Sequence, residues 1–387
     1  MSTERRDIMR IGMNAETMKQ MNRMSALRRI ATEGEVMRLT LAESLGLTRM
    51  SLTNVVNDLI SNGYIEEKPA YGDHKVGRNP IPLSIAKTAP KSIGVWISRD
   101  HIAMAVCDMT LQVLYTGKID LYRETEETIQ QKLLALAEEA VPYSQPAMGI
   151  VIAMIGAIDP EAEELVHPKN FFGIERLNVK DILKDRFPLP VYVNNDMNCA
   201  ALAESMYGRY RRYQNMLYIG LDNGVGAGII HQGQLMQGGH VGIGEIGHMS
   251  IECTGERCAC GNRGCLENYV SIPVLEKQFA QAGSCFKDRC ALPENSAVME
   301  SAAEYLVVAM VNLVNILHPD IILMGHQGSF IPKHLLSFME EKVNTLRFTD
   351  AEKPLRIRHA HFGEIAPLLG GAALVYDAFF RKGKCTY

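Results

Sequence analysis

The chain has 387 residues and a formal net charge of −4, from 40 basic and 44 acidic side chains. A chain of this length exceeds one average hydrophobic core, so we expect two or three domains. The small net charge excludes a polybasic protein, and nine cysteines in so long a chain exclude a disulfide-rich secreted scaffold.

The charge is unevenly distributed along the chain. Residues 1–90 have a net charge of +3, whereas the remainder has a net charge of −7. A mildly basic head on an acidic body is typical of a nucleic-acid module fused to a domain that binds a small molecule. The N-terminus lacks the apolar segment of about ten residues that a secretory signal needs. The longest apolar run, residues 148–158, is too short to span a bilayer, so we expect a cytoplasmic protein without a membrane segment.

The first ninety residues predict helices followed by a hairpin. Apolar side chains recur at three-residue spacing over residues 14–32: Met18, Met21, Met24, Leu27 and Ile30. A short second helix covers residues 39–45, and Thr48 can cap a third helix over residues 49–61. The buried stripe of the third helix is expected to contain Leu52, Val55, Val56, Leu59 and Ile60. Strands are predicted at residues 64–65 and 80–85, around a polar turn.

This order of elements is typical of a winged helix-turn-helix, whose third helix enters the DNA major groove. Its outward face would contact DNA through Arg49, Ser51, Thr53 and Asn54. The hairpin adds Lys75 and Arg78, which could reach phosphate or a minor groove. The alternative is a three-helix bundle that binds a protein.

After a short linker, residues 91–196 predict three strands, a helix, a strand, a helix and a strand. That order is typical of a ribonuclease-H-like, actin-type lobe. Residues 197–364 are expected to form a second lobe with its own strands and long helices, and a closing helix within residues 365–387 would complete the first lobe. The fold class is therefore α/β, with an N-terminal winged helix-turn-helix on residues 1–90.

Four potential metal ligands lie within the second lobe: His248, Cys258, Cys260 and Cys265. Three thiolates and an imidazole suit a closed tetrahedral Zn²⁺ site, although the Cys-x-Cys spacing is tighter than that of a zinc finger. Packed or redox-active thiols are the alternative. Because Glu245 and Glu267 flank the ligands, we expect structural zinc to hold a loop whose carboxylates bind a polyhydroxylated ligand.

Several motifs resemble the ROK family (repressors, open reading frames and sugar kinases), over the whole chain. The resemblance is to its sugar-responsive repressor branch, the xylose, N-acetylglucosamine and glucose repressors. It is carried by GEIGHM (244–249), CACGNRGCLE (258–267), VNNDMNCAALAE (193–204), DNGVGAGII (222–230), HPKNFFGI (167–174) and IAPLLGGAAL (365–374). The cysteine segment is the most specific of these motifs.

The resemblance implies roles for individual residues. It places His248 and the three cysteines on zinc, and Asp196 at the position of the kinases' general base. The implied sugar-binding residues are Asn170, Asn195, Asp196, Glu245, His248 and Glu267. Structural alternatives remain, because Asn195 could be a residue of a strand-end turn, and Asp196 or Glu267 could cap the helix that follows it.

The motifs with which sugar kinases bind nucleotide are not retained in this chain. Where those kinases have an Asp-x-Gly-x-Thr phosphate turn, this chain reads Gly94-Val95-Trp96-Ile97-Ser98-Arg99-Asp100. A second phosphate turn of the kinases usually contains Gly-Thr-Gly, and this chain has Asp222-Asn223-Gly224 there. Near the adenosine site the kinases usually have two consecutive glycines, and this chain has Gly325-His326.

We therefore predict no catalytic residues, with Asp196 a vestigial base. The expected function is that of a repressor that binds operator DNA as a homodimer or homotetramer and is released by a monosaccharide. The alternatives are an active sugar kinase fused to a DNA-binding domain, or a repressor that a partner protein controls.

Overall fold

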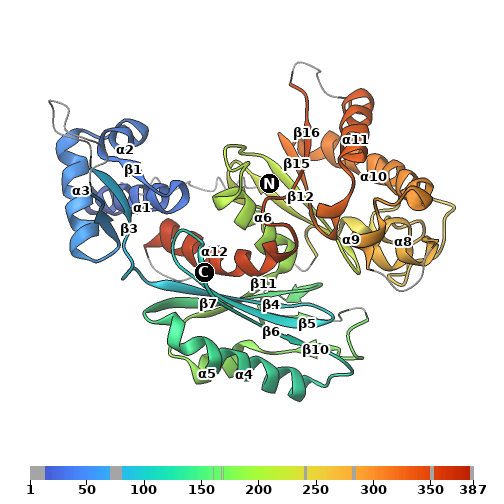
Figure 1. The fold of residues 1–387 in the computed structure, drawn as a ribbon, viewed down its shortest axis with the longest axis horizontal. Helices are drawn as coiled ribbons and strands as arrows, with labels where there is room; N and C mark the ends of the chain where they lie inside the picture. Colours follow the sequence, from blue (N-terminus) through green and yellow to red (C-terminus); the bar gives the residue numbers. More distant parts are fainter. Residues whose placement is uncertain are drawn as a thin grey trace, which may run out of the picture. The chain divides into compact units, whose positions relative to one another are not determined.

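The structure is a computed structural model that describes residues 14–69, 81–159, 161–166, 168, 170–238, 242–280, 285–348 and 353–383 (Figure 1). The described residues form two compact units. One unit combines the chain up to Ala89 with the residues from Asp377 onward, and the other covers residues 90–376.

The N-terminal unit contains three helices and a small antiparallel sheet. The helices are α1 (Ala15–Glu33), α2 (Arg38–Leu45) and α3 (Arg49–Ser61), and the strands are β1 (Val36–Met37), β2 (Ile65–Glu67) and β3 (Pro82–Ile85), with β3 in the centre. Thr48 caps α3, because its side chain accepts a hydrogen bond of 3.2 Å from the Ser51 N–H. The predicted bounds of α3 are confirmed, whereas β1 was not predicted.

Ile60, which was predicted to belong to the buried stripe of α3, is exposed, and so are two members of the three-residue apolar series in α1. Met18 and Met21 of α1 are 50% and 52% exposed, and Ile60 of α3 is 37% exposed. In α1, each three-residue step rotates the side chain by about 300°, which is about 60° short of a full turn, so a series at strict three-residue spacing drifts away from the buried face. Met24, Leu27 and Ile30 do face the core.

The first lobe of the body has a five-stranded sheet in the order β11-β7-β4-β5-β6. The strands are β4 (Lys91–Ile97), β5 (His101–Cys107), β6 (Val113–Asp120), β7 (Ala147–Met154) and β11 (Val191–Asn195). Strands β4, β5 and β6 are antiparallel neighbours, whereas β7 and β11 run parallel to β4. Helices α4 (Glu126–Ser144) and α5 (Lys180–Arg186) cover one face, and α12 (Ala366–Lys382) covers the other (Figure 1).

The second lobe repeats this topology with the strand order β14-β13-β12-β15-β16. Its strands are β12 (Met216–Leu221), β13 (Val225–His231), β14 (Gln234–Leu235), β15 (Ile321–His326) and β16 (Arg356–His359). Helices α10 (Ser296–Leu317) and α11 (Lys333–Leu346) pack with this sheet in one apolar core, separate from the core of the first lobe. The expected pair of similar α/β lobes is therefore present.

Smaller elements position the candidate site. Helix α6 (Asp196–Tyr207) follows β11 directly, and a short 3-10 helix (Ile246–His248) precedes the cysteine loop. The helix expected after Glu267 is divided into α7 (Glu267–Val270) and α8 (Ile272–Gln278). A short sheet of β8 (Ile158–Asp159), β9 (Glu164–Val166) and β10 (Arg176–Leu177) and the short helix α9 (Phe286–Arg289) were not predicted.

Helix α12 lies unusually close to its neighbours. A β-carbon on Gly94 of β4 would overlap the Leu368 carbonyl, and one on Gly370 would overlap the Cys199 carbonyl of α6. Only glycine fits at these contacts, which confirms that the small residues of α12 allow close helix approach.

Two helical segments have the length and composition to cross a membrane. They are Pro293–Leu317, 50% buried, and Gly363–Lys382, 83% buried within the structure. Buried core helices have the same composition, so these segments are weak indications of a membrane protein.

Candidate functional site

The four predicted metal ligands converge in the second lobe. The ligand atoms of His248, Cys258, Cys260 and Cys265 all lie within 4.8 Å of one another. The Cys260 and Cys265 sulfurs are 3.6 Å apart, and the Cys258 sulfur is 3.8 Å from the His248 Nδ1. A tetrahedral zinc with Zn–S bonds of about 2.3 Å would separate its sulfur ligands by about 3.8 Å, so these residues fit the ion.

A tight hairpin brings these ligands together. Cys258 donates its N–H to Asn262 across a 2.8 Å hydrogen bond, and Cys265 pairs with Ser250 in an isolated β-bridge. Gly264 has a φ of +62°, and a β-carbon there would overlap the Glu252 carbonyl. Both the backbone angle and the available space therefore require glycine at position 264.

A cavity of about 270 Å³ adjoins the cysteine loop. Five of the six predicted sugar-binding residues line it: Asn195, Asp196, Glu245, His248 and Glu267. Asn170 is exposed and is not among the described residues that line this cavity, although Pro168 is. A role for Asn170 remains a prediction.

Asn195, rather than Asp196, caps helix α6. Its Oδ1 accepts hydrogen bonds from the N–H groups of Met197 (2.9 Å) and Asn198 (3.2 Å), and its Nδ2 donates to the Gly156 carbonyl (3.0 Å). The carboxamide of Asn195 is thus mostly committed to the fold, which leaves one N–H for a ligand.

Asp196 is 4% exposed and faces the cavity at the first residue of α6. Burial raises the pKa of its carboxyl to about 7, against the lowering effect of the nearby Arg99 guanidinium. The carboxylates of Asp222 and Glu245 raise it further.

Glu267 and Glu245 belong to the two ends of the cysteine loop. Glu267 starts α7, two residues after Cys265, and accepts a hydrogen bond of 3.3 Å from the Val225 N–H with its Oε2. Burial raises the pKa of Glu245, and the adjacent Glu267 raises it too, whereas His248 lowers it. The ligands therefore hold the segments that bring both carboxylates to the cavity.

Sequence reasoning missed Arg99, which also lines the cavity. Its positive charge lowers the pKa values of Asp196, Asp222 and Glu245. No motif identifies such a residue, because it comes from the β4–β5 turn and meets the other lobe only in the folded chain.

The β4–β5 turn, which the resemblance predicts to correspond to the phosphate turn of the kinases, is hydrogen-bonded within itself. The Ser98 hydroxyl accepts hydrogen bonds of 3.3 Å from the N–H groups of both Asp100 and His101, and Asp100 bonds the His101 Nδ1 at 2.7 Å. The hydrogen bond from His101 holds the pKa of Asp100 well below its usual range. The N–H groups of Asp100 and His101 are therefore already engaged within the turn.

Aromatic side chains occupy the space beside this turn. The Trp96 ring lies edge-on to His101, at 4.6 Å between centroids, and to His326 of the second lobe, at 5.4 Å. Trp96 is 7% and His326 is 2% exposed, and burial lowers the pKa of His326 to about 4. A buried imidazole with a lowered pKa therefore follows Gly325 at this point.

The predicted DNA-contacting residues of α3 share an outward face. Arg49, Ser51, Thr53 and Asn54 are all exposed, whereas Leu52, Val55, Val56 and Leu59 are buried. Lys75 and Arg78 lie outside the described residues.

Comparisons with known proteins identify relatives over most of the chain. The xylose repressor of Caldicellulosiruptor bescii is 28% identical over 94% of this chain and 97% of its own length. The crystal structure of a ROK family transcriptional regulator, a homologue of the E. coli Mlc protein, superimposes with a TM-score of 0.77 at 26% identity. That comparison covers 94% of this chain and 97% of the other.

A ROK family glucokinase from Streptomyces griseus, solved with glucose and AMPPNP, matches with a TM-score of 0.65 and 25% identity. It covers 73% of this chain and 98% of the kinase, so the body has the fold of a sugar kinase. The model of the ROK family matches residues 92–378. This chain therefore belongs to the ROK family.

Proposed function

We propose that this protein is a sugar-responsive transcriptional repressor. The N-terminal unit binds operator DNA, and the cavity at the cysteine loop binds a neutral monosaccharide that releases it. The similarity to a xylose repressor and to a ROK transcriptional regulator, both along more than nine-tenths of this chain, supports this assignment.

The observation that carries the proposal is a contrast within the body. Side chains that can bind sugar hydroxyls line one cavity, namely Asp196, Glu245, His248 and Glu267, and the phosphate turn beside it has closed. A neutral ligand suits this cavity, because its carboxylates would repel a nucleotide triphosphate.

A structural zinc fits the four-ligand cluster, where it would supply four bonds that fix the loop without an open coordination position. If the His248 Nδ1, which lies 3.8 Å from the Cys258 sulfur, were a zinc ligand, its Nε2–H would remain to donate to a sugar hydroxyl. Glu245 and Glu267 would accept hydrogen bonds from other hydroxyls of the same sugar.

The N-terminal unit has the element order of a winged helix-turn-helix. Its α3 would enter the major groove with Arg49, Ser51, Thr53 and Asn54 toward the bases, and Lys75 and Arg78 would contact the backbone or minor groove. Helix-turn-helix proteins usually bind palindromic sites as symmetric assemblies, so we expect a homodimer or homotetramer in the cytoplasm.

The second candidate function is a sugar kinase, which Asp196 favours, because it lies at the position of the family's general base. An assay for ADP release across a panel of hexoses and pentoses, with Asp196→Asn as control, distinguishes the two. Turnover faster than the Asp196→Asn background would identify a kinase; ligand binding without turnover supports the repressor.

The proposal is tested by a thermal-shift screen of the purified protein against xylose, glucose and N-acetylglucosamine. A ligand at 100 times its dissociation constant stabilises the folded state by about 2.7 kcal/mol, so a true effector stands out. Absence of any shift at millimolar sugar, together with release from DNA by a protein partner, would favour control by that partner.

A further inference from the structure

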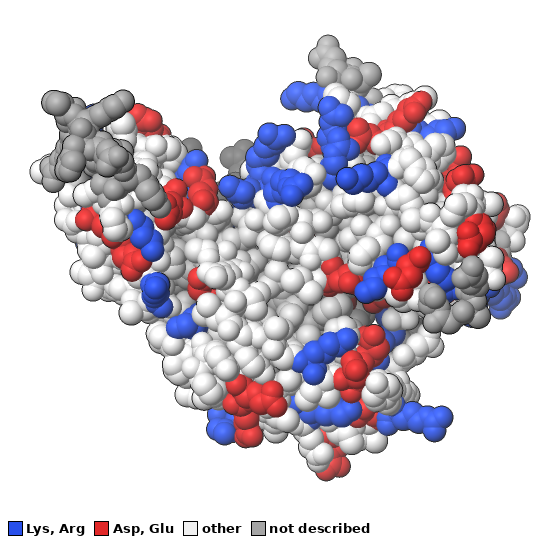
Figure 2. Space-filling view, viewed as in Figure 1, with Lys and Arg blue, Asp and Glu red and all other residues white. Residues whose placement is uncertain are grey.

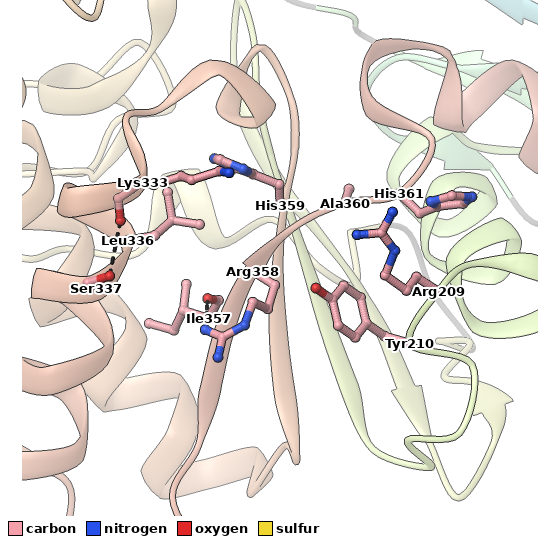
Figure 3. Close-up of a pocket in the computed structure, with 10 residues that line it drawn as sticks. All are labelled: Arg209, Tyr210, Lys333, Leu336, Ser337, Ile357, Arg358, His359, Ala360 and His361. Atoms are coloured by element: carbon pink, nitrogen blue, oxygen red, sulfur yellow. Dashed lines mark hydrogen bonds between the residues drawn. The ribbon is translucent and has the colours of Figure 1, made fainter.

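A second hollow, of about 420 Å³, lies in the second lobe away from the sugar cavity, and its lining shares no residue with that cavity. Figure 3 shows that its walls come from the first turn of α11, from β16 with the residues after it, and from the turn that follows α6. Nothing in the proposed sugar response uses this hollow.

The hollow is basic. Three of its lining side chains carry a positive charge, two more are histidines, and none is a carboxylate: Arg209, Lys333, Arg358, His359 and His361. Residues 91–387 have a net charge of −7, so this local excess opposes the general charge of the body. Figure 2 shows Lys and Arg side chains gathered over the part of this lobe where β16 and α11 lie.

The positive charge is only partly neutralised within the chain. Arg358 pairs with Glu340, but the same carboxylate also pairs with Arg356 at 3.1 Å and accepts the Ile357 N–H at 2.8 Å. Among the described residues, the side chains of Arg209 and Lys333 have no hydrogen-bond or ion-pair partner. Two cations therefore remain for an anionic ligand.

The backbone of α11 adds to the positive electrostatic potential of the hollow. Lys333 is the first residue of α11, a helix of 14 residues, and Pro332 before it supplies no side-chain cap. The N-terminus of a helix carries a partial positive charge and attracts anions.

The remaining lining suits the organic part of a ligand. Leu336, Ile357 and Ala360 are at most 8% exposed and give an apolar floor, with the Tyr210 ring at one side (Figure 3). A volume of about 420 Å³ exceeds that of a lone phosphate and lies within the range of small-molecule sites.

We propose that this hollow binds a phosphate monoester of about the size of a sugar phosphate, with Arg209, Lys333 and Arg358 around the phosphate. Arginine and lysine are the usual partners of phosphate oxygens. The sugar cavity, lined by Asp196, Asp222, Glu245 and Glu267, favours neutral ligands, so the two sites would take different chemical forms of carbohydrate.

Calorimetry on the full chain tests the site, with glucose 6-phosphate, inorganic phosphate and glucose as probes. The test variant is Arg209→Gln/Lys333→Gln. The matched control is Arg123→Gln/Lys184→Gln, which removes two exposed cations of the first lobe that likewise have no partner among the described residues. We expect about tenfold or more weaker binding of glucose 6-phosphate to the test variant, and a change of less than about twofold in the control.

Asp196→Asn separates this site from the sugar cavity. Binding of glucose 6-phosphate that is unchanged in Asp196→Asn supports a separate site, whatever becomes of the sugar response. Inorganic phosphate binding as tightly as the ester would identify free phosphate as the ligand. The proposal is overturned if neither phosphate binds below about 10 mM, if both double variants weaken binding equally, or if Asp196→Asn removes it.

Discussion

The carboxyl group of Asp196 is buried at the start of α6, where Asn195 already supplies the helix cap. The Oδ1 of Asp196 accepts the Met197 N–H at 2.9 Å, so folding places an acid with a pKa of about 7 in the cavity although another residue is the N-cap. Such a group lowers stability unless a ligand compensates for it, which is typical of a binding site.

We predict that Asp196→Asn stabilises the free protein at pH 8 and weakens sugar binding. Between the usual pKa of 3.8 and the folded value of about 7, the folded state binds more protons than the unfolded state. The free energy of unfolding of the wild type thus falls as pH rises through this window, and the amide removes that loss. Thermal denaturation should show a gain on the order of 1–3 kcal/mol at pH 8 and none near pH 4.

Sugar affinity of the same variant should fall about 10- to 100-fold, the usual loss for one charge-assisted hydrogen bond. Calorimetry with the effector measures it. Unchanged affinity would remove Asp196 from the binding site.

Helix α6 carries a second buried acid that provides a matched control. Glu204 is fully buried, accepts the Phe362 N–H at 2.7 Å, and has a pKa raised by burial to about 7. It does not line the sugar cavity. Glu204→Gln keeps an oxygen acceptor for Phe362, so we predict loss of the stability decline between pH 4.5 and 7 without a change in sugar affinity. A change in sugar affinity would show that α6 transmits strain to the cavity.

At the scale of single elements, we propose that sugar binding depends on the conformation of the cysteine loop. We predict that Cys260→Ser lowers the zinc content below one ion per chain, reduces the melting temperature by more than about 5 °C, and removes sugar binding. Cys253→Ser is the control, because Cys253 is a free, exposed cysteine of the same loop outside the ligand cluster. Full sugar binding by a zinc-free Cys260→Ser variant would contradict a structural role for zinc.

Sequence patterns predict those elements whose signal is local. Thr48 marks the start of α3, and Gly264 marks the turn of the cysteine loop, because capping and positive φ depend on nearest neighbours. The choice of Asn195 over Asp196 as cap depends on the backbone at the end of β11, which no spacing reveals. Arg99 and Trp96 join the second lobe only through tertiary packing, so their environments could not be predicted.

At the scale of the whole molecule, the body has the fold of a sugar kinase. A xylose repressor, in contrast, matches 94% of the chain. Release of operator DNA by a sugar requires that sugar binding at the cavity and DNA binding at the N-terminal unit be coupled. By linkage, operator DNA must weaken sugar binding by the factor with which sugar weakens DNA binding.

The most direct test is the operator dissociation constant with and without saturating sugar, using DNA selected by the protein from a random pool and the sugar found by thermal shift. We predict that sugar raises the operator dissociation constant by about tenfold or more in the wild type. In Asp196→Asn, a higher sugar concentration should be needed for the same increase. An operator affinity that stays constant while calorimetry shows the sugar bound would contradict the account.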